Sequence, residues 1–255
     1  MSELSFAARA AGALCGQFIG DAASLGVHWI YNRQDIHSAH PEGVVGFEKP
    51  ASGHYHDGKE PGDQTHYGDA ALILLQSVNE MGRFESHDYG KRYVSYFGSD
   101  DCASYIDKAT RGTIENFELW KEKNPDQDDQ YSFQNGADDD QLATVTSLSP
   151  VLLLDFKDKD YLNSIEKVTK VRQNNAKAVA YAQAHAMILH GLLEGRDLHS
   201  TLHRTEEQLA KIGSDEALEV KRKIAAAMGE SLMPVPEATE KFGQSCPLGS
   251  SFPSA

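Results

Sequence analysis

Apolar residues recur along most of the chain at intervals of three or four, the spacing of one face of an α-helix. This pattern predicts a first helix over residues 4–19. It also predicts a long helix from Val179 to Leu193 that stops at Gly195, a favoured residue just beyond a helix C-terminus. Further helical periods lie within 71–78, 89–97, 106–117, 198–212 and 215–228. No segment alternates as a β-strand would and no repeat is visible, so we predict an all-α fold in which residues 1–255 form one domain.

The longest interruption of this pattern is an irregular segment, residues 28–66, that is rich in Gly, Pro, Asp and His. It carries six of the 11 histidines of the chain: His28, His37, His40, His54, His56 and His66. Loops of this length are uncommon in compact domains and are often functional. His54 and His56 could ligate a metal from an extended loop. No cysteine or third nearby histidine completes a zinc set by spacing, however, so we interpret the pair as surface histidines.

Two further features of the pattern need a structural reason. Gly12, Gly16 and Gly20 recur every four residues on one face of the first helix. Because glycine costs helix stability, this stripe indicates the close approach of another helix or of a ligand. At the other end, the chain carries no charge after Lys241, and we expect no helix to pack this tail.

Composition and charge narrow the classes of partner. The chain has 255 residues, of which 40% are hydrophobic, enough to fill a core. Its formal net charge of −14 repels the phosphates of nucleic acids and anionic membrane surfaces, so we expect neither as a partner. Three cysteines without a CxxC pair argue against a disulfide framework. With no signal peptide or membrane span visible, we expect a cytoplasmic protein.

Two stretches offer polar groups that could hold a ligand. In Gly20–Tyr31, "GDAASLGVHWIY", an acid and two glycines at a helix end could bind a polar ligand, or the stretch could simply end a helix with its aromatic residues in the core. The carboxylates of residues 138–140 suit a hard cation such as Mg²⁺ or Ca²⁺, although the spacing is not that of an EF-hand, and an acidic loop that caps the next helix explains them equally well. There is no P-loop, GxSxG or GxGxxG motif.

Taken in order, four stretches resemble the ADP-ribosylglycohydrolase family. "GALCGQFIGDAASLGVHWIY" is similar to its N-terminal GxxxGDAxG signature, and "GDQTHYGDAALILL" lies where the family has Thr-Asp-Asp-Thr at the start of a helix. "NGADDDQLATVTSLSPVLLL" resembles its internal glycine-rich turn, and "VRQNNAKAVAYAQAHAMILHGLLEG" its His-Asn-His-Pro-like start of a long helix. Details such as "VHWIYN" and "HYH" are most similar to the branch that holds crystallin J1 and selenoprotein J.

The resemblance implies a compact multi-helix domain with two Mg²⁺ ions, which polarise the ribose and activate a water for cleavage of the bond between ADP-ribose and an acceptor. On this basis we predict Thr65 and Asp138 as metal ligands and His66 as the catalytic residue. The predicted substrate-binding residues are Gly20, Asp21, His28, Tyr67, Asp139 and Gln173.

The resemblance also locates departures from the family pattern. Where the family has paired aspartates after the threonine matched by Thr65, this chain has His66 and Tyr67, and Gly68 takes the place of the next threonine. An imidazole and a neutral phenol are poor ligands for Mg²⁺. The late aspartate motif of the family is not found, so we expect the chain to stop short of the family's last helices.

These departures lead to the functional expectation. We expect an ADP-ribosylglycohydrolase-like protein that binds an ADP-ribose-like small molecule and whose Mg²⁺-dependent hydrolysis is weak or lost. In one alternative the protein is an active hydrolase: residues Thr65, His66, Asp138 and Asp139 hold one softer metal, or His66 acts as a general base. In the other it is a crystallin-like structural protein without a ligand.

Overall fold

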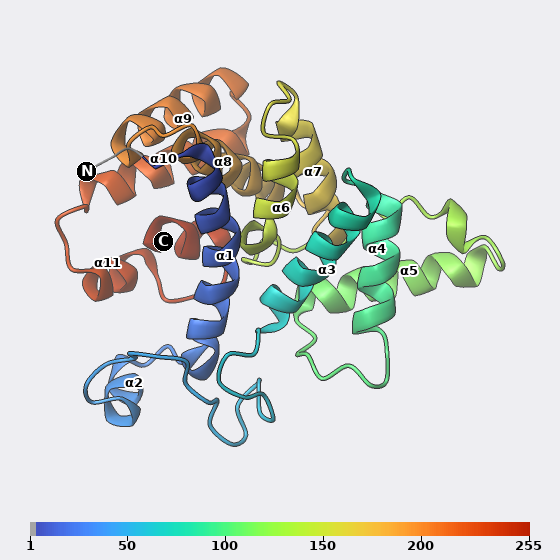
Figure 1. The fold of residues 1–255 in the computed structure, drawn as a ribbon, viewed down its shortest axis with the longest axis horizontal. Coiled ribbons are helices and arrows are strands. Elements are labelled where there is room, and N and C mark those ends of the chain that lie inside the picture. The colour runs from blue at the N-terminus through green and yellow to red at the C-terminus, as the bar shows by residue number, and fades with distance from the viewer. Residues whose placement is uncertain (1–3) are drawn as a thin grey trace.

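The computed structural model describes residues 4–255, and these form α-helices, short 3₁₀ turns and loops without a β-strand (Figure 1). The all-α prediction is therefore confirmed. The helices are α1 (Phe6–Ser24), α2 (Arg33–Ala39), α3 (His66–Met81), α4 (Ser86–Phe97), α5 (Lys108–Lys123), α6 (Ser149–Leu154), α7 (Tyr161–Arg172), α8 (Ala176–Leu193), α9 (Leu198–Ile212), α10 (Asp215–Gly229), α11 (Val235–Phe242) and α12 (Leu248–Ser251).

The helices form two packed groups that meet through the contacts of α7 with α4 and α5 and through α1, which touches both. Helix α8 contacts α7, α9 and α10 in one group, and α4 packs between α3 and α5 in the other (Figure 1). Helix α8 is rich in alanine, and the small side chains of Ala182, Ala184 and Ala186 are fully buried, which lets neighbouring helices approach closely. Helix α1 packs against α3, α6 and α8, so its C-terminal end reaches the start of α3.

Most of the aromatic side chains of α4 lie in the core, whereas Tyr96 is 41% exposed. Tyr89, Tyr93 and Phe97 are buried. The guanidinium of the fully buried Arg172 lies 5.2 Å from the Tyr93 ring centroid, and the Tyr93 hydroxyl lies 2.6 Å from Thr110 Oγ1. A cation over a desolvated aromatic face is stabilising. This contact ties the end of α7 to α4 and α5.

Three local expectations were wrong. Helix α1 continues to Ser24, beyond the predicted end at residue 19. Gly12, Gly16 and Gly20 are exposed, and a Cβ at any of them would meet no atom within 4 Å, so helix packing does not explain the stripe. The segment 28–66 is not wholly irregular, because Asn32 caps the short helix α2 through a hydrogen bond to the Gln34 backbone N–H.

The uncharged tail also differs from expectation, because it does contain a helix. Helix α12 packs on α8, and Leu248 is buried. The Leu248 backbone N–H donates to the Asp140 carbonyl at 2.9 Å, beside an isolated bridge between Gln141 and Pro247. The tail lacks charge because much of it covers apolar surface. Through the bond to the Asp140 carbonyl, the tail also holds in place the loop that contains residues 138–140, called the acidic loop below.

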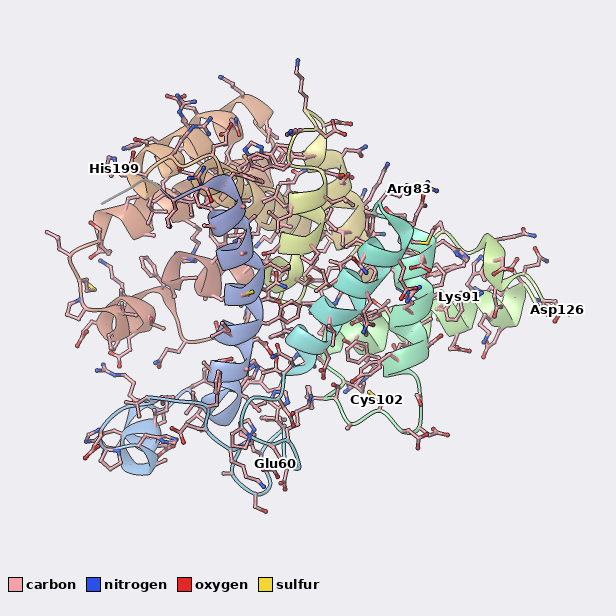
Figure 2. The ribbon with its side chains drawn as sticks, viewed as in Figure 1. Glu60, Arg83, Lys91, Cys102, Asp126 and His199 are labelled. Atoms are coloured by element: carbon pink, nitrogen blue, oxygen red, sulfur yellow. The ribbon has the colours of Figure 1, made fainter. Side chains whose placement is uncertain are left out.

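The long segment between Leu25 and Thr65 lies below the C-terminal end of α1 and the start of α3 (Figure 1). Glu60 marks its lower edge, and Cys102, in the connection between α4 and α5, lies beside it (Figure 2). Three loops therefore meet at one end of the molecule: this segment, the α4–α5 connection and the acidic loop. This end holds the candidate site.

We predict that Gly136→Ala destabilises the protein by about 1–3 kcal/mol, because a Cβ at this position would lie 2.4 Å from the backbone carbon of Arg172, which cannot move aside cheaply. The control is Gly12→Ala in the exposed face of α1, which we expect to stabilise by about 0.5–1 kcal/mol. Urea unfolding of both variants measures the difference. Equal effects of the two substitutions would show that the Gly136 contact is not tight.

Candidate functional site

The site is organised by a contact between the last turns of α1 and the cap of α3. The Asp21 carboxylate accepts hydrogen bonds from the Thr65 backbone N–H at 2.7 Å and from Thr65 Oγ1 at 2.6 Å. Thr65 Oγ1 in turn accepts from the Tyr67 backbone N–H and caps α3. Gly68 lies directly against this contact, since a Cβ there would be 2.3 Å from Asp21 Oδ2. The predicted residues Asp21 and Thr65 thus lie together and satisfy each other, while Gly20, in the same turn of α1, is exposed.

Three histidines converge beside this contact. His28 follows the 3₁₀ turn after α1, His56 lies in the long segment, and His66 is the first residue of α3. Their ring centroids are 5.1–5.8 Å apart, and one nitrogen from each lies within 4.8 Å of the others. Within residues 4–255 this is the one group of three or more His, Cys, Asp or Glu side chains placed closely enough to hold a metal. His56 is only 2% exposed, so its interpretation as a surface histidine was wrong.

Aromatic side chains line one side of the histidine cluster. The Trp29 ring stacks on His56 and lies edge-on to Tyr55 and Tyr105, with ring centroids 4.9–5.8 Å away. The Trp29 Nε1–H donates to the Cys246 thiol at 3.1 Å. Trp29 has a φ of 60°, in the left-handed region that bulky residues avoid, so surrounding contacts must hold it there.

Asp107, which the sequence analysis did not single out, supports His66 from α5. Its Oδ1 accepts from the Thr110 backbone N–H at 2.7 Å as the cap of α5, and its Oδ2 lies 3.4 Å from His66 Nε2. Burial alone would raise the pKa of Asp107. The His66 hydrogen bond and charge, with the charge of Arg172, instead hold that pKa well below its usual range, so Asp107 is ionised. The sequence "DKAT" carries a helix-cap signal but none for burial.

Tyr67 joins α3 to the neighbouring elements. Its buried side chain packs with Ala109 of α5 and Ala143 of the acidic loop, and its ring centroid lies 3.9 Å from that of His66. Burial, reinforced by the negative charge of Asp107, raises the pKa of the Tyr67 phenol well above 10. Tyr67 therefore presents a neutral hydroxyl at working pH.

The acidic loop contributes one buried carboxylate next to this group. Asp139 Oδ2 accepts from the Gln141 backbone N–H and from Gln173 Nε2, and Asp139 Oδ1 lies 3.3 Å from Lys108 Nζ. Gln173 is fully buried and also bonds the backbone of residues 139–144, so it fixes the shape of this loop. Asp138, predicted as a metal ligand, is exposed and accepts from Asn175 Nδ2 at 2.7 Å.

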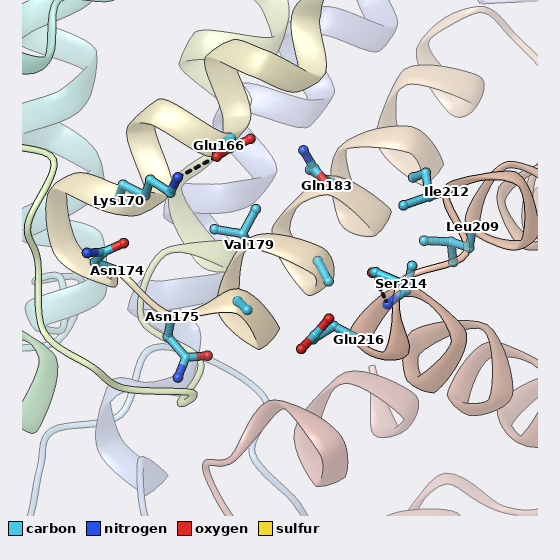
Figure 3. Close-up of a pocket in the computed structure, with 13 residues that line it drawn as sticks. Glu166, Lys170, Asn174, Asn175, Val179, Gln183, Leu209, Ile212, Ser214 and Glu216 are labelled. Atoms are coloured by element: carbon cyan, nitrogen blue, oxygen red, sulfur yellow. Dashed lines mark hydrogen bonds and ion pairs between the residues drawn. The ribbon is translucent and has the colours of Figure 1, made fainter.

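A pocket of about 350 Å³ lies elsewhere, between α7, α8, α9 and α10 (Figure 3). The ion pair between Lys170 and Glu166 lies on one side of it, and Leu209 and Ile212 lie on the other. None of the residues that the sequence analysis predicted for the site lines this pocket. The predicted residues instead gather where α1, α3 and the acidic loop meet.

The fold and the sequence define the class of protein. A family model described as ADP-ribosylglycohydrolase matches residues 2–255, so the chain belongs to the ADP-ribosylglycohydrolase family. It also resembles a solved structure described as an "ADP-ribosylglycohydrolase-related protein complex", with a TM-score of 0.64 and 18% identity over 96% of this chain and 85% of that one. At this identity the likeness shows the fold alone.

The similar proteins within this class include two crystallins of Tripedalia cystophora. The chain is 28% identical to crystallin J1A over 201 residues, which cover 74% of this chain and 60% of that protein. It is 27% identical to crystallin J1B over 267 residues, which cover 100% of this chain and 78% of that protein. The match thus takes in less than two thirds of the length of crystallin J1A. In residues 4–255, no helix combines the length and the apolar character needed to cross a bilayer.

We predict that Asp21→Asn costs about 1–3 kcal/mol of stability, because an amide cannot accept from both Thr65 donors and directs an N–H at one of them. The same change at the exposed Asp138, Asp138→Asn, is the matched control, and its effect should stay within about 0.5 kcal/mol. Both values follow from urea unfolding. A cost as small as that of the control would contradict the importance of the contact.

Acid should destabilise the metal-free protein through the histidine cluster. Burial, followed by the charges of neighbouring histidines, lowers the pKa of both His28 and His56 from 6.5 to about 3. Between these values the unfolded chain binds protons that the folded chain does not, so stability is complete above pH 6.5 and is lost as the pH falls towards 3. Each histidine contributes at most about 1.4 kcal/mol per pH unit.

Urea midpoints between about pH 7.5 and about pH 5.5, measured with a chelator, test this slope. His56→Gln removes one titrating group and should flatten the profile. His37→Gln, at an exposed position of α2, should leave it unchanged. If stability depended on pH equally in the two variants, the histidine cluster would not be the source of the loss of stability in acid.

Proposed function

We propose that this member of the ADP-ribosylglycohydrolase family binds an ADP-ribose-type ligand where α1, α3 and α5 meet, and that Mg²⁺-dependent hydrolysis is weak or lost. One observation carries the proposal. The first turn of α3 directs the buried imidazole of His66 and the neutral phenol of Tyr67 into the position where the family resemblance implies paired aspartates.

The residues present do not fit magnesium. Mg²⁺ prefers a near-octahedral set of oxygen ligands, often carboxylates. Both oxygens of the Asp21 carboxylate already accept hydrogen bonds from Thr65. The Asp69 carboxylate accepts from Lys59 Nζ at 2.7 Å and from the Ser104 hydroxyl. The closest potential metal group in the described part of the chain consists of nitrogen donors instead. This nitrogen set does not suit Mg²⁺.

Binding of a dinucleotide-like anion is supported by the arrangement of helix ends. Helices α3 and α5 both begin at the cluster, and the dipole of a helix favours a phosphate group near its N-terminus. Lys108, in the first turn of α5, is 66% exposed and adds a positive charge. Trp29, Tyr55 and Tyr105 offer ring faces on which an adenine could stack.

A second candidate function is hydrolysis without magnesium, with His66 as a general base. The observation that favours it is the pairing of His66 Nε2 with the ionised Asp107 at 3.4 Å, an arrangement that orients an imidazole for proton transfer. Turnover assays with ADP-ribosyl-arginine, ADP-ribosyl-serine and O-acetyl-ADP-ribose test it. Activity that is lost in His66→Ala would support this candidate, and no turnover of any of the three would remove it.

A third candidate is a structural protein, which the crystallin names of two relatives suggest. It predicts no ligand for the cluster. Calorimetry with ADP-ribose separates this candidate from the binding proposal, because only the binding proposal predicts saturable heat.

We predict that ADP-ribose binds the full chain in isothermal titration calorimetry and that Lys108→Ala weakens binding about 3–10-fold, as expected for an exposed cation near a diphosphate. Lys123→Ala, at the far end of the same helix, is the matched control and should leave the affinity unchanged. Millimolar Mg²⁺ should not raise the melting temperature, because a ligand stabilises only the state that binds it.

Two results would contradict the proposal. One is the absence of ADP-ribose binding to the wild-type chain. The other is a large Mg²⁺-dependent rise in melting temperature together with Mg²⁺-dependent turnover, which would show that the oxygen ligands of Mg²⁺ assemble after all.

A further inference from the structure

The three clustered histidines carry ring nitrogens that no protein group satisfies. Both nitrogens of His56, both nitrogens of His66 and Nε2 of His28 are buried without a hydrogen-bond partner. Buried polar groups are almost always paired, so several orphaned nitrogens that face one another need an explanation such as a bound ion. Aromatic packing alone does not provide one, because Trp29 and Tyr105 offer these nitrogens no hydrogen bond.

We propose that His28, His56 and His66 form a three-histidine site for a zinc-type divalent ion. Three imidazoles with a fourth position left open are an established ligand set for Zn²⁺. Ligating nitrogens in a tetrahedral zinc site lie about 3.3 Å apart, as follows from Zn–N bonds of about 2.0–2.1 Å. The nitrogens here already lie within 4.8 Å of one another, so a contraction of at most about 1.5 Å completes the set.

The residues around the cluster hold the ligands as metal sites commonly do. Histidine ligands usually direct their second nitrogen to a carboxylate or a carbonyl, which fixes the ring and its tautomer. Asp107 Oδ2 lies 3.4 Å from Nε2 of His66, and a bond from Nδ1 to the ion would use the other ring nitrogen. Asp107 is itself fixed as the cap of α5.

His54 connects the two other ligands. Its Nδ1 accepts from the His56 backbone N–H at 3.2 Å, so its Nε2 carries the proton and donates to the His28 carbonyl at 2.6 Å. Because both of its nitrogens are used, His54 acts as a positioning residue and not as a fourth ligand. It ties the long segment to the end of α1 and brings His28 and His56 together.

The nitrogen set selects the class of ion. Imidazole suits zinc, copper, iron and nickel, whereas Mg²⁺ and Ca²⁺ require oxygen. The inference therefore goes beyond the proposed binding of an ADP-ribose-type ligand and does not depend on it. The chain would keep the family fold while its metal chemistry changes from oxygen to nitrogen ligands.

A surface group on α9 provides the stringent control. His199 and His203 lie one turn apart with ring centroids separated by 4.5 Å, and Glu206 Oε2 lies 3.2 Å from His203 Nδ1. Exposed histidines at this spacing bind divalent metals adventitiously. Removal of His203 eliminates this group without any change near α3.

The test is calorimetric titration of Zn²⁺ into the full chain after removal of metal. We expect one ion per chain at the cluster, with affinity reduced at least about 100-fold in His56→Gln and unchanged at that site in His203→Gln. Asp107→Asn keeps the helix cap, because asparagine caps as well as aspartate, and should weaken binding about 10–100-fold through His66. Far-ultraviolet circular dichroism without metal confirms that each variant is folded, and His28→Gln replaces His56→Gln if the latter unfolds.

Two further readouts complete the test. Zn²⁺ should raise the melting temperature of the wild-type chain but not of His56→Gln, and Co²⁺ in its place should give the intense visible absorption of a tetrahedral site. Binding that disappears in His203→Gln but persists in His56→Gln would mean an adventitious surface ion only and would overturn the proposal. Both titrations are run without ADP-ribose, so failure of ADP-ribose binding leaves this result intact.

Discussion

The carboxylate of Asp21, shared by two donors of Thr65, is the contact on which the geometry of the site depends. It fixes the end of α1 against the cap of α3. His28 lies shortly after the first partner and His66 immediately after the second, so one hydrogen-bonded contact brings together two side chains that are far apart in the sequence. A side chain at residue 68 would meet the Asp21 carboxylate and the side chain of Gln64, so the glycine there fits the close contact.

Much of the fold could be predicted from the sequence, because long amphipathic helices such as α9 and α10 carry a clear helical period of apolar residues. The short elements could not be predicted. Helix α12 lies in an uncharged tail whose period is too brief to read, and it is stabilised by packing on α8 and by a bond to the Asp140 carbonyl. For the site, the family-like stretches pointed to Asp21, Thr65 and Tyr67. The parts that were missed, His56 and Asp107, depend on burial and on contacts across the chain, for which local spacing gives no signal.

Buried polar contacts fix the parts of the chain that surround the site. Gln173 and the C-terminal tail hold the acidic loop and its buried Asp139. Asp107, the cap of α5, adds a buried negative charge that is balanced by His66 and by the buried Arg172. A buried charge is stable only if it has a partner of opposite charge or a hydrogen bond. The buried Arg172 in the core therefore helps to keep Asp107 ionised beside His66.

The contacts of the Trp29 indole make this residue a fluorescence probe of the site. The chain contains two tryptophans, and Trp29 is the one whose indole touches the histidine cluster and donates to the Cys246 thiol. Trp120 lies instead on α5 beside Tyr131. Sulfhydryl and imidazole groups quench indole emission on contact, so the fluorescence of Trp29 is a built-in optical probe of this end of the molecule. In a Trp120→Phe background it would report in real time when a ligand enters or when the C-terminal tail undocks.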